Sequence, residues 1–132
     1  MSRFYDIDAA NERLAELRPL LEALRDDRKA VAEAQAELVA FRETNGNRDH
    51  AAELGRREDL IREIVRRMQR SVARIDGWDV TLREIEGGLV DFPALVSGRP
   101  IWLCWRLGED EVGFWHEQDT GFSNRKPLID LE

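Results

Sequence analysis

The sequence lacks several features that would assign its class at once. It has one cysteine, Cys104, so it cannot form an internal disulfide framework. It has no run of about 18 apolar residues, the length that a membrane-spanning helix requires. Its first residues, MSRFYDIDAANERL, lack the basic and apolar blocks of a signal peptide. These absences predict a cytoplasmic protein that makes no use of a membrane.

The chain also lacks the short motifs of common cofactor sites. No GxGxxG or P-loop sequence is present, and no CxxC, HxxxH or HExxH spacing occurs. A metal could therefore be bound only by donors that the fold brings together from separate segments. No motif identifies a catalytic residue.

Charged residues make up 36% of the chain, against roughly a quarter in a typical globular domain. The net charge of −7 argues against a protein that depends on attraction to phosphate, so nucleic acid is a disfavoured partner. Residues 6–43 are acidic overall and residues 47–75 are basic overall. Two segments of opposite sign, each long enough for a helix, are predicted to lie side by side.

Two apolar repeats of seven residues predict two long helices. Asp6 begins the first helix, Pro19 lies inside it with an expected kink, and Asn45-Gly46 provides the reversal before the second, which ends near Gly77. The first repeat comprises Ile7, Leu14 and Leu21 with Ala10, Leu17, Leu24, Val31 and Leu38. The second comprises Leu54, Ile61, Met68 and Ile75, widened by Ile64, Val65 and Val72. Residues 6–77 are thus predicted to form an antiparallel helical hairpin.

Each arm of this hairpin would be roughly 40 Å long at about 1.5 Å per residue. The small C-terminal part could not cover such a length. Self-association of two hairpins into a four-helix arrangement would bury the remainder, so a coiled-coil-like homodimer is expected.

After Gly77 the pattern changes from helical to alternating, which predicts strands. We expect an α+β fold in one domain over residues 1–132: the helical hairpin of residues 6–77 packed with a small antiparallel β-meander in residues 78–132. With residues 108–111 as the β-hairpin loop, Trp105 would pair with Phe114 and Leu103 with His116. His116 would then share the apolar face, although a one-residue bulge would exchange the faces.

The second half of the chain also carries a family resemblance. It lies in Gly88-Leu89-Val90-Asp91-Phe92-Pro93, in Leu103-Cys104-Trp105-Arg106-Leu107-Gly108-Glu109, in Trp115-His116-Glu117, and in Gly121-Phe122 with Arg125 and Pro127. Phe4-Tyr5 and Ala10-Asn11 add to it near the start. On these residues the chain resembles the domain-of-unknown-function family 2203, small bacterial proteins without an established activity. The resemblance implies no reaction and no catalytic residue.

The densest group of aromatic and polar residues follows Gly88. Because a strand places side chains on both faces and the helices can cover only one, the other face would meet a ligand, a partner subunit or solvent. The candidate ligand-binding residues are Asp91, Trp102, Arg106, Trp115, His116 and Arg125. Asp91 with the two arginines could bind a small anionic ligand, or could form a salt bridge that ties the C-terminal tail to the sheet.

A divalent metal is the cofactor that a second group of residues could hold. The candidate donors are Asp91, Cys104, His116, Glu117 and Asp119. In this interpretation His116 and the carboxylates act as ligands or as acid–base groups. Alternatively, His116 is a hydrogen-bonded residue at a strand end, and Cys104 is a small core residue rather than a nucleophile.

Arg62, Arg66, Arg70 and Arg74 lie four residues apart and predict a basic ridge along the second helix. The ridge could bind RNA or could pair with acidic residues of the first helix.

Three functional hypotheses follow from these patterns. The first is a dimeric interaction or small-ligand-binding protein that uses its aromatic C-terminal β-hairpin. The second is a small, metal-dependent enzyme, and the third is RNA binding through the Arg62–Arg74 ridge.

Overall fold

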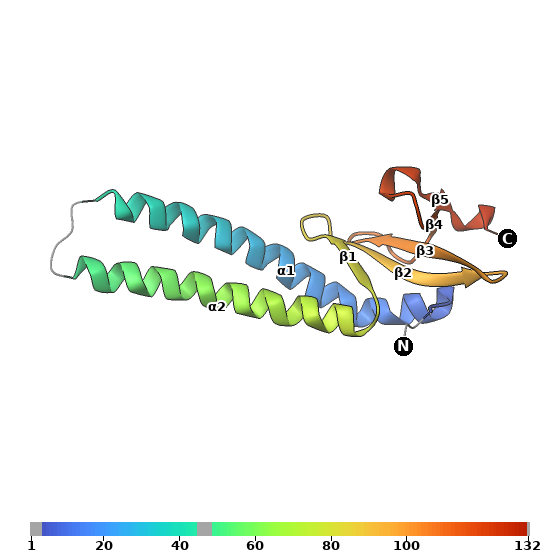
Figure 1. The fold of residues 1–132 in the computed structure, drawn as a ribbon, viewed down its shortest axis with the longest axis horizontal. Helices are drawn as coiled ribbons and strands as arrows, with labels where there is room; N and C mark the ends of the chain where they lie inside the picture. Colours follow the sequence, from blue (N-terminus) through green and yellow to red (C-terminus); the bar gives the residue numbers. More distant parts are fainter. Residues whose placement is uncertain (1–3, 45–48, 132) are drawn as a thin grey trace.

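The computed structural model describes residues 4–44 and 49–131 and shows an α+β fold, as predicted (Figure 1). The helices are α1 (Ile7–Arg42) and α2 (His50–Gly77). The strands are β1 (Thr81–Glu84), β2 (Leu89–Val96), β3 (Arg99–Arg106), β4 (Phe114–Glu117) and β5 (Lys126–Pro127). They form an antiparallel sheet in the order β1-β2-β3-β4-β5. Two 3-10 turns, η1 (Phe122–Asn124) and η2 (Leu128–Asp130), lie in the tail.

Helix α1 begins where the sequence predicts. The Asp6 side chain accepts a hydrogen bond of 2.7 Å from the backbone N–H of Ala9, which satisfies one free donor at the helix start. The helix then continues through Pro19 without interruption. The predicted Asn45-Gly46 reversal falls outside the described residues. No helix in the described ranges is long and apolar enough to cross a membrane.

The two helices are joined by a polar contact as well as by their apolar seam. Asp27 of α1 is buried and accepts two hydrogen bonds from Arg67 of α2, at 2.7 and 3.2 Å. This bidentate pairing raises the pKa of Arg67. A second, longer ion pair of 3.8 Å connects Arg57 with Glu37. These contacts tie the acidic helix to the basic one.

The basic ridge does not take part in this contact. Arg62 pairs with Asp59 of its own helix at 2.9 Å, and Arg74 lies 5.5 Å from the ring of Trp78. Within residues 4–44 and 49–131, Arg66 and Arg70 form no ion pair. The predicted pairing of the ridge with α1 is therefore wrong, because the helix turns Arg67, and not the ridge, towards Asp27.

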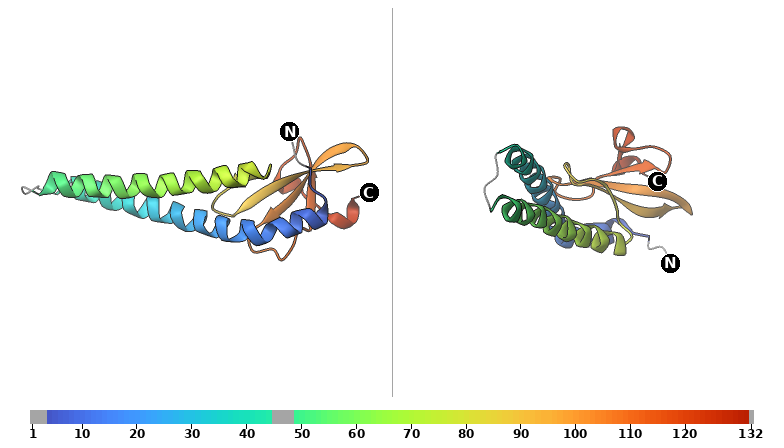
Figure 2. Two further views of the ribbon diagram at one scale, coloured as in Figure 1. Left: turned by 90° about the horizontal axis from the view of Figure 1, so that it is seen from below. Right: turned by 60° about the vertical axis from the view of Figure 1, so that its left-hand side comes forward.

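The sheet packs one face on the N-terminal half of α1, and the far half of the helical hairpin extends beyond it (Figures 1 and 2). This face and the apolar repeat of α1 form one buried core; its members include Leu14, Leu17, Leu21, Val90, Phe92, Leu103, Trp105 and Trp115. The N-terminal segment completes the core. The backbone N–H of Tyr5 donates to the carbonyl oxygen of Pro93 at 2.7 Å, and its hydroxyl donates to the carbonyl oxygen of Trp78 at 2.6 Å.

The pairing of β3 with β4 differs from the prediction by one residue. Trp102 lies opposite His116, and Cys104 lies opposite Phe114. The predicted pairs of Trp105 with Phe114 and of Leu103 with His116 are therefore wrong. The cause is the connection, which occupies residues 107–113 rather than four residues. A shift of one residue moves every side chain of a strand to the other face, so His116 leaves the apolar core face.

Two local hydrogen bonds and one long-range hydrogen bond hold the connection between β3 and β4. The side chain of Glu109 accepts a hydrogen bond of 2.8 Å from the backbone N–H of Arg106, and its backbone carbonyl accepts one of 3.1 Å from the indole of Trp105. The side-chain oxygen of Asn11 in α1 accepts from the backbone N–H of Val112 at 2.7 Å. The register of β4 thus depends partly on a helix that is about a hundred residues away in sequence.

Truncation of the core tests this packing. Leu17 is fully buried between α1 and the sheet, whereas Leu60 of α2 is 52% exposed. We expect Leu17→Ala to lower the free energy of unfolding by about 2–5 kcal/mol, because it leaves a cavity in a close-packed interior. Leu60→Ala is the matched control and should change it by no more than about 0.5 kcal/mol. Urea unfolding of both variants measures the difference, and equal losses would contradict the described packing.

Candidate functional site on the sheet face opposite the helices

The sheet has a second face, away from α1, and it carries a different set of side chains. Alternation along the strands places Asp91 of β2, Trp102 and Cys104 of β3, and Phe114 and His116 of β4 on this face. Asp91, Cys104 and His116 are buried. They are buried because residues after β4 fold back over this face of the sheet, not because the helices cover them.

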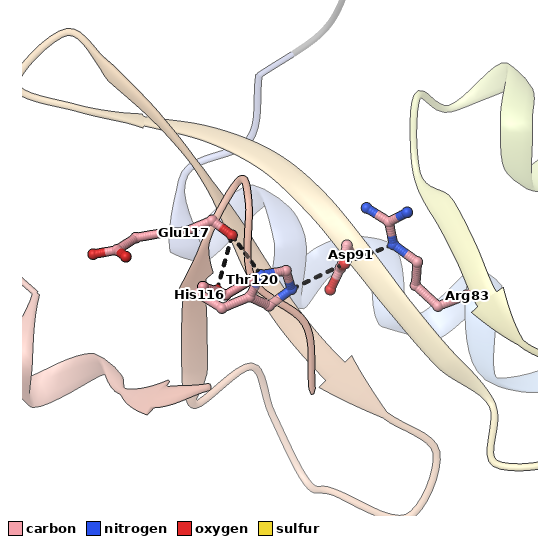
Figure 3. Close-up of polar contacts among 5 residues, drawn as sticks. All are labelled: Arg83, Asp91, His116, Glu117 and Thr120. Atoms are coloured by element: carbon pink, nitrogen blue, oxygen red, sulfur yellow. Dashed lines mark hydrogen bonds and ion pairs between the residues drawn. The ribbon is translucent and has the colours of Figure 1, made fainter. Parts of the chain in front are cut away.

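Asp91 lies at the centre of the polar contacts on this face (Figure 3). One of its carboxylate oxygens, Oδ2, lies 3.0 Å from Nε2 of His116 and accepts a hydrogen bond of 2.8 Å from Nε of Arg83. The other imidazole nitrogen, Nδ1, lies 2.8 Å from the backbone carbonyl oxygen of Glu117. A buried carboxylate is costly without such partners, and here a guanidinium and an imidazole supply them.

The surroundings of His116 determine where its protons lie. A carbonyl oxygen can only accept, so Nδ1 must carry a proton and donate it to Glu117. Nε2 then either carries a second proton, which makes the ring a cation paired with Asp91, or presents a lone pair to another cation. The second carboxylate oxygen of Asp91, Oδ1, is buried and has no hydrogen-bonding partner within the described part of the chain. One acceptor of the site is therefore unsatisfied.

Cys104 completes the buried cluster. One ligand atom each from Asp91, Cys104 and His116 lies within 4.8 Å of the other two. Burial raises the pKa of the Cys104 thiol to about 12, the negative charge of Asp91 adds to the increase, and Arg125 offsets part of it. At neutral pH the thiol is therefore protonated and a poor nucleophile.

Arg125 has a structural position beside this cluster. Its guanidinium donates two hydrogen bonds to Glu109, at 3.1 and 2.8 Å, and lies 3.8 Å from the ring centre of Phe114 and 4.3 Å from that of Phe122. It thus fastens the tail to the sheet. Asp91, the partner considered in the sequence, pairs with Arg83 instead.

The structure does not bring Asp91, Arg106 and Arg125 together as one anion-binding group. Arg106 is exposed and lies 5.5 Å from the ring of Phe122. Trp102 lies on the site face, 4.9 Å beneath the guanidinium of Arg83. Trp115 points to the opposite face and belongs to the apolar core.

The structure brings together three of the five metal-donor candidates. Glu117 points outward, where its carboxylate lies 3.4 Å from Lys126 and 4.0 Å from Arg99. Asp119 is exposed on the wall of the pocket that Asp91 and His116 also line, and it is not part of the close cluster. Because Glu117 and Asp119 lie outside the cluster, the donor set consists of one carboxylate, one thiol and one imidazole.

A pocket of about 300 Å³ opens over Asp91 and His116. Arg83 and Leu89 form one side, and the tail forms the other with Gln118, Asp119, Thr120, Gly121 and Phe122. Arg83 was not among the residues predicted from the sequence. Val80 and Leu82 alternate with Thr81 and Arg83 in the sequence, and this pattern indicates a strand but no partner for Arg83. Only the pairing of β1 with β2 placed it beside Asp91.

A known protein family matches almost the whole chain. The family described as "Uncharacterized conserved protein (DUF2203)" matches residues 3–128. The chain belongs to the DUF2203 family. No curated protein and no solved structure matches the chain. The basis for the function of this DUF2203 protein is therefore the chemistry of the site.

The raised pKa of Cys104 gives a direct test of the site's geometry. We expect the thiol of the folded protein to react with a disulfide reagent at pH 8 about a thousandfold more slowly than the unfolded chain, because a pKa of about 12 leaves far less thiolate than one near 9. The rate should rise as the pH approaches 12. The raised pKa also makes the free energy of unfolding depend on pH. The protonated thiol contributes its full stabilisation below about pH 9, and this contribution is lost as the pH rises through about 12.

Asp91→Asn is the informative comparison for this measurement, because it removes the second cause of the raised pKa while keeping the size of the side chain. Its folded thiol should react faster than that of the unchanged protein. Rapid labelling of the unchanged folded protein at pH 8 would contradict the buried position of Cys104.

Proposed function

We propose that this DUF2203 protein is a binding protein that holds a small anionic molecule in the pocket over Asp91 and His116. The observation that carries this proposal is a charged, buried group at the base of a pocket. A structural salt bridge alone needs no opening, whereas here a space of about 300 Å³ lies over the pair. That volume is at the lower end of the range for small-molecule sites.

The free donors of Arg83 at the pocket wall favour an anion. Arg83 uses Nε for Asp91, and its two terminal nitrogens have no hydrogen-bonding partner within residues 4–44 and 49–131. A planar guanidinium offers these paired donors to a carboxylate or a phosphate. Phe122 adds an aromatic surface at the pocket wall, while the exposed Asp119 is screened by solvent. The ligand class that fits is a small carboxylate or phosphate compound.

We further propose that two copies associate through the helical hairpin. An apolar groove of about 750 Å³ runs between α1, α2 and the start of β1. Its residues include Val31, Ala32, Val65, Met68 and Val72. Val65 and Val72 remain 36% and 37% exposed, and Val39 extends the same face of α1 at 52% exposure. An apolar groove with half-exposed valines on its walls is a surface on which a partner can pack.

A second copy is the occupant that best fits this groove. The sheet covers only one end of the helical hairpin, so the rest of the hairpin packs as a two-helix layer (Figure 1). Two such layers would cover each other's apolar faces in a four-helix arrangement with two-fold symmetry. As part of the same proposal, we expect the protein in the cytoplasm, where reducing conditions keep the Cys104 thiol free.

Anion binding can be measured with simple probes. We expect inorganic phosphate or a small dicarboxylate such as malate to change the tryptophan fluorescence, because Trp102 lies beneath Arg83. Arg83→Gln should weaken binding at least tenfold, since it removes the paired donors. Arg99→Gln is the matched control: Arg99 is also an exposed strand arginine near a tryptophan, but it lies outside the pocket. Equal affinity of both variants would contradict the proposed pocket.

Association can be measured by native mass spectrometry and by light scattering after gel filtration. We expect a dimer for the unchanged chain and a monomer for Val65→Glu/Val72→Glu, because two carboxylates would be buried in the groove. Leu60→Glu is the control, since Leu60 is exposed on α2 but does not line the groove. A monomeric unchanged chain would refute this part of the proposal.

A further inference from the structure

Three buried side chains on the site face differ from an ordinary salt bridge in their chemistry. Asp91, Cys104 and His116 offer an oxygen, a sulfur and a nitrogen, and each comes from a different strand of the sheet. Strands hold such donors more rigidly than loops do. Every donor lies on the same face and within 4.8 Å of the other two.

We propose that Asp91, Cys104 and His116 bind a divalent transition-metal ion, with zinc as the best match to the donor set. A mixture of carboxylate, thiolate and imidazole suits Zn²⁺ better than Mg²⁺ or Ca²⁺, which prefer oxygen ligands alone. Three protein ligands leave a fourth position for a small molecule or water. The proposal builds on the proposed function, because the ion would lie at the base of the same pocket.

The orientation of His116 is that of a metal ligand. Its Nδ1–H donates to the backbone carbonyl of Glu117 at 2.8 Å, and this contact directs Nε2 towards Asp91. In metal sites a ligating histidine commonly donates its other ring N–H to a carbonyl or carboxylate, which fixes the tautomer and the ring. A cation between Nε2 and Asp91 would take the place of the second ring proton.

Asp91 supplies the second, independent observation. Its Oδ1 is buried and has no hydrogen-bonding partner among the described residues, although a buried carboxylate oxygen normally has one. Arg83 occupies only Oδ2. Coordination of an ion would satisfy Oδ1 and leave the Arg83 contact in place.

Cys104 would bind as the thiolate and release its proton to solvent, so the ion replaces one proton at the thiol. A bound divalent cation reverses the local electrostatics that otherwise keep the thiol protonated. The sulfur does not line the pocket, whereas Asp91 and His116 do. The open coordination position would therefore face the pocket, where an anion held by Arg83 could reach it.

Cobalt and zinc are the probes for this site. The chain of 132 residues, treated with a chelator and then dialysed, should bind one Co²⁺ or Zn²⁺ ion per chain. The cobalt form should show near-ultraviolet absorption from charge transfer between thiolate and metal. X-ray absorption of the zinc form should show one sulfur at about 2.3 Å and nitrogen or oxygen scatterers at about 2.0 Å. A zinc shell without sulfur, or no binding, would overturn the proposal without any need for a variant.

Variants then separate the ligands from their neighbours. Cys104→Ser should abolish the charge-transfer absorption and weaken Zn²⁺ binding at least about a hundredfold, while urea unfolding confirms that it folds. Glu117→Gln is the matched control and should keep both, because the Glu117 side chain points away from the cluster. Unchanged affinity in Cys104→Ser would overturn the assignment.

Arg83→Gln distinguishes this proposal from the proposed function. Arg83 is not a metal donor, so the variant should still bind one ion per chain while losing phosphate or malate. Metal binding without anion binding in the unchanged chain would refute the anion pocket alone. Anion binding without metal binding would refute the metal site alone and would indicate that the anion's own donor group satisfies Asp91.

Discussion

The arrangement of this protein depends on a sheet that, within residues 4–44 and 49–131, has α-helices on one face alone. Side chains alternate between the two faces of β2, β3 and β4, so each strand that contributes to the core also presents residues to the other side. On the helix side these residues are large and apolar, and they bury the repeat of α1. On the other side they include Asp91, Cys104 and His116, and the tail after β4 lies over this part of the sheet. The polar cluster is therefore a direct consequence of how the core is built.

The C-terminal tail is held to the sheet by specific contacts of Arg125. Arg125 lies between Phe114 and Phe122 and forms a bidentate ion pair with Glu109. Glu109 in turn accepts hydrogen bonds from the end of β3, which sets the length of the connection to β4. The same glutamate thus links the register of β4, which orients His116, to the position of the segment that covers His116. A polar cluster held in this way is protected from water on one side and still open to the pocket on the other.

The sequence was sufficient for the helices but not for the site. The seven-residue repeats of α1 and α2 and the Asp6 cap are local patterns, and the helical hairpin follows from them. The alternation after Gly77 is also local and adds the strands of the α+β class. The position of His116 depends on the length of a connection, and the connection is held by Asn11 of α1 and by Glu109. Local alternation cannot detect that restraint, so the predicted register was one residue away and the face of His116 was reversed. Arg83 was missed for the same reason, since its partner is known only once β1 is paired with β2.

The cost of burying Asp91 argues that the cluster has a role beyond stability. Replacement of a buried ion pair by hydrophobic residues is often neutral or stabilising, so stability alone does not require such a pair. Asp91 adds a further cost, because one of its oxygens has no partner within the described part of the chain. The Asp27–Arg67 pair between the helices shows the contrast, because there both carboxylate oxygens accept a hydrogen bond. Asp27 meets the requirements of a structural contact, and Asp91 does not. The unsatisfied oxygen belongs to Asp91, whose carboxylate also lies beside a thiol, an imidazole and a pocket. A bound ion or ligand at this position would satisfy that oxygen.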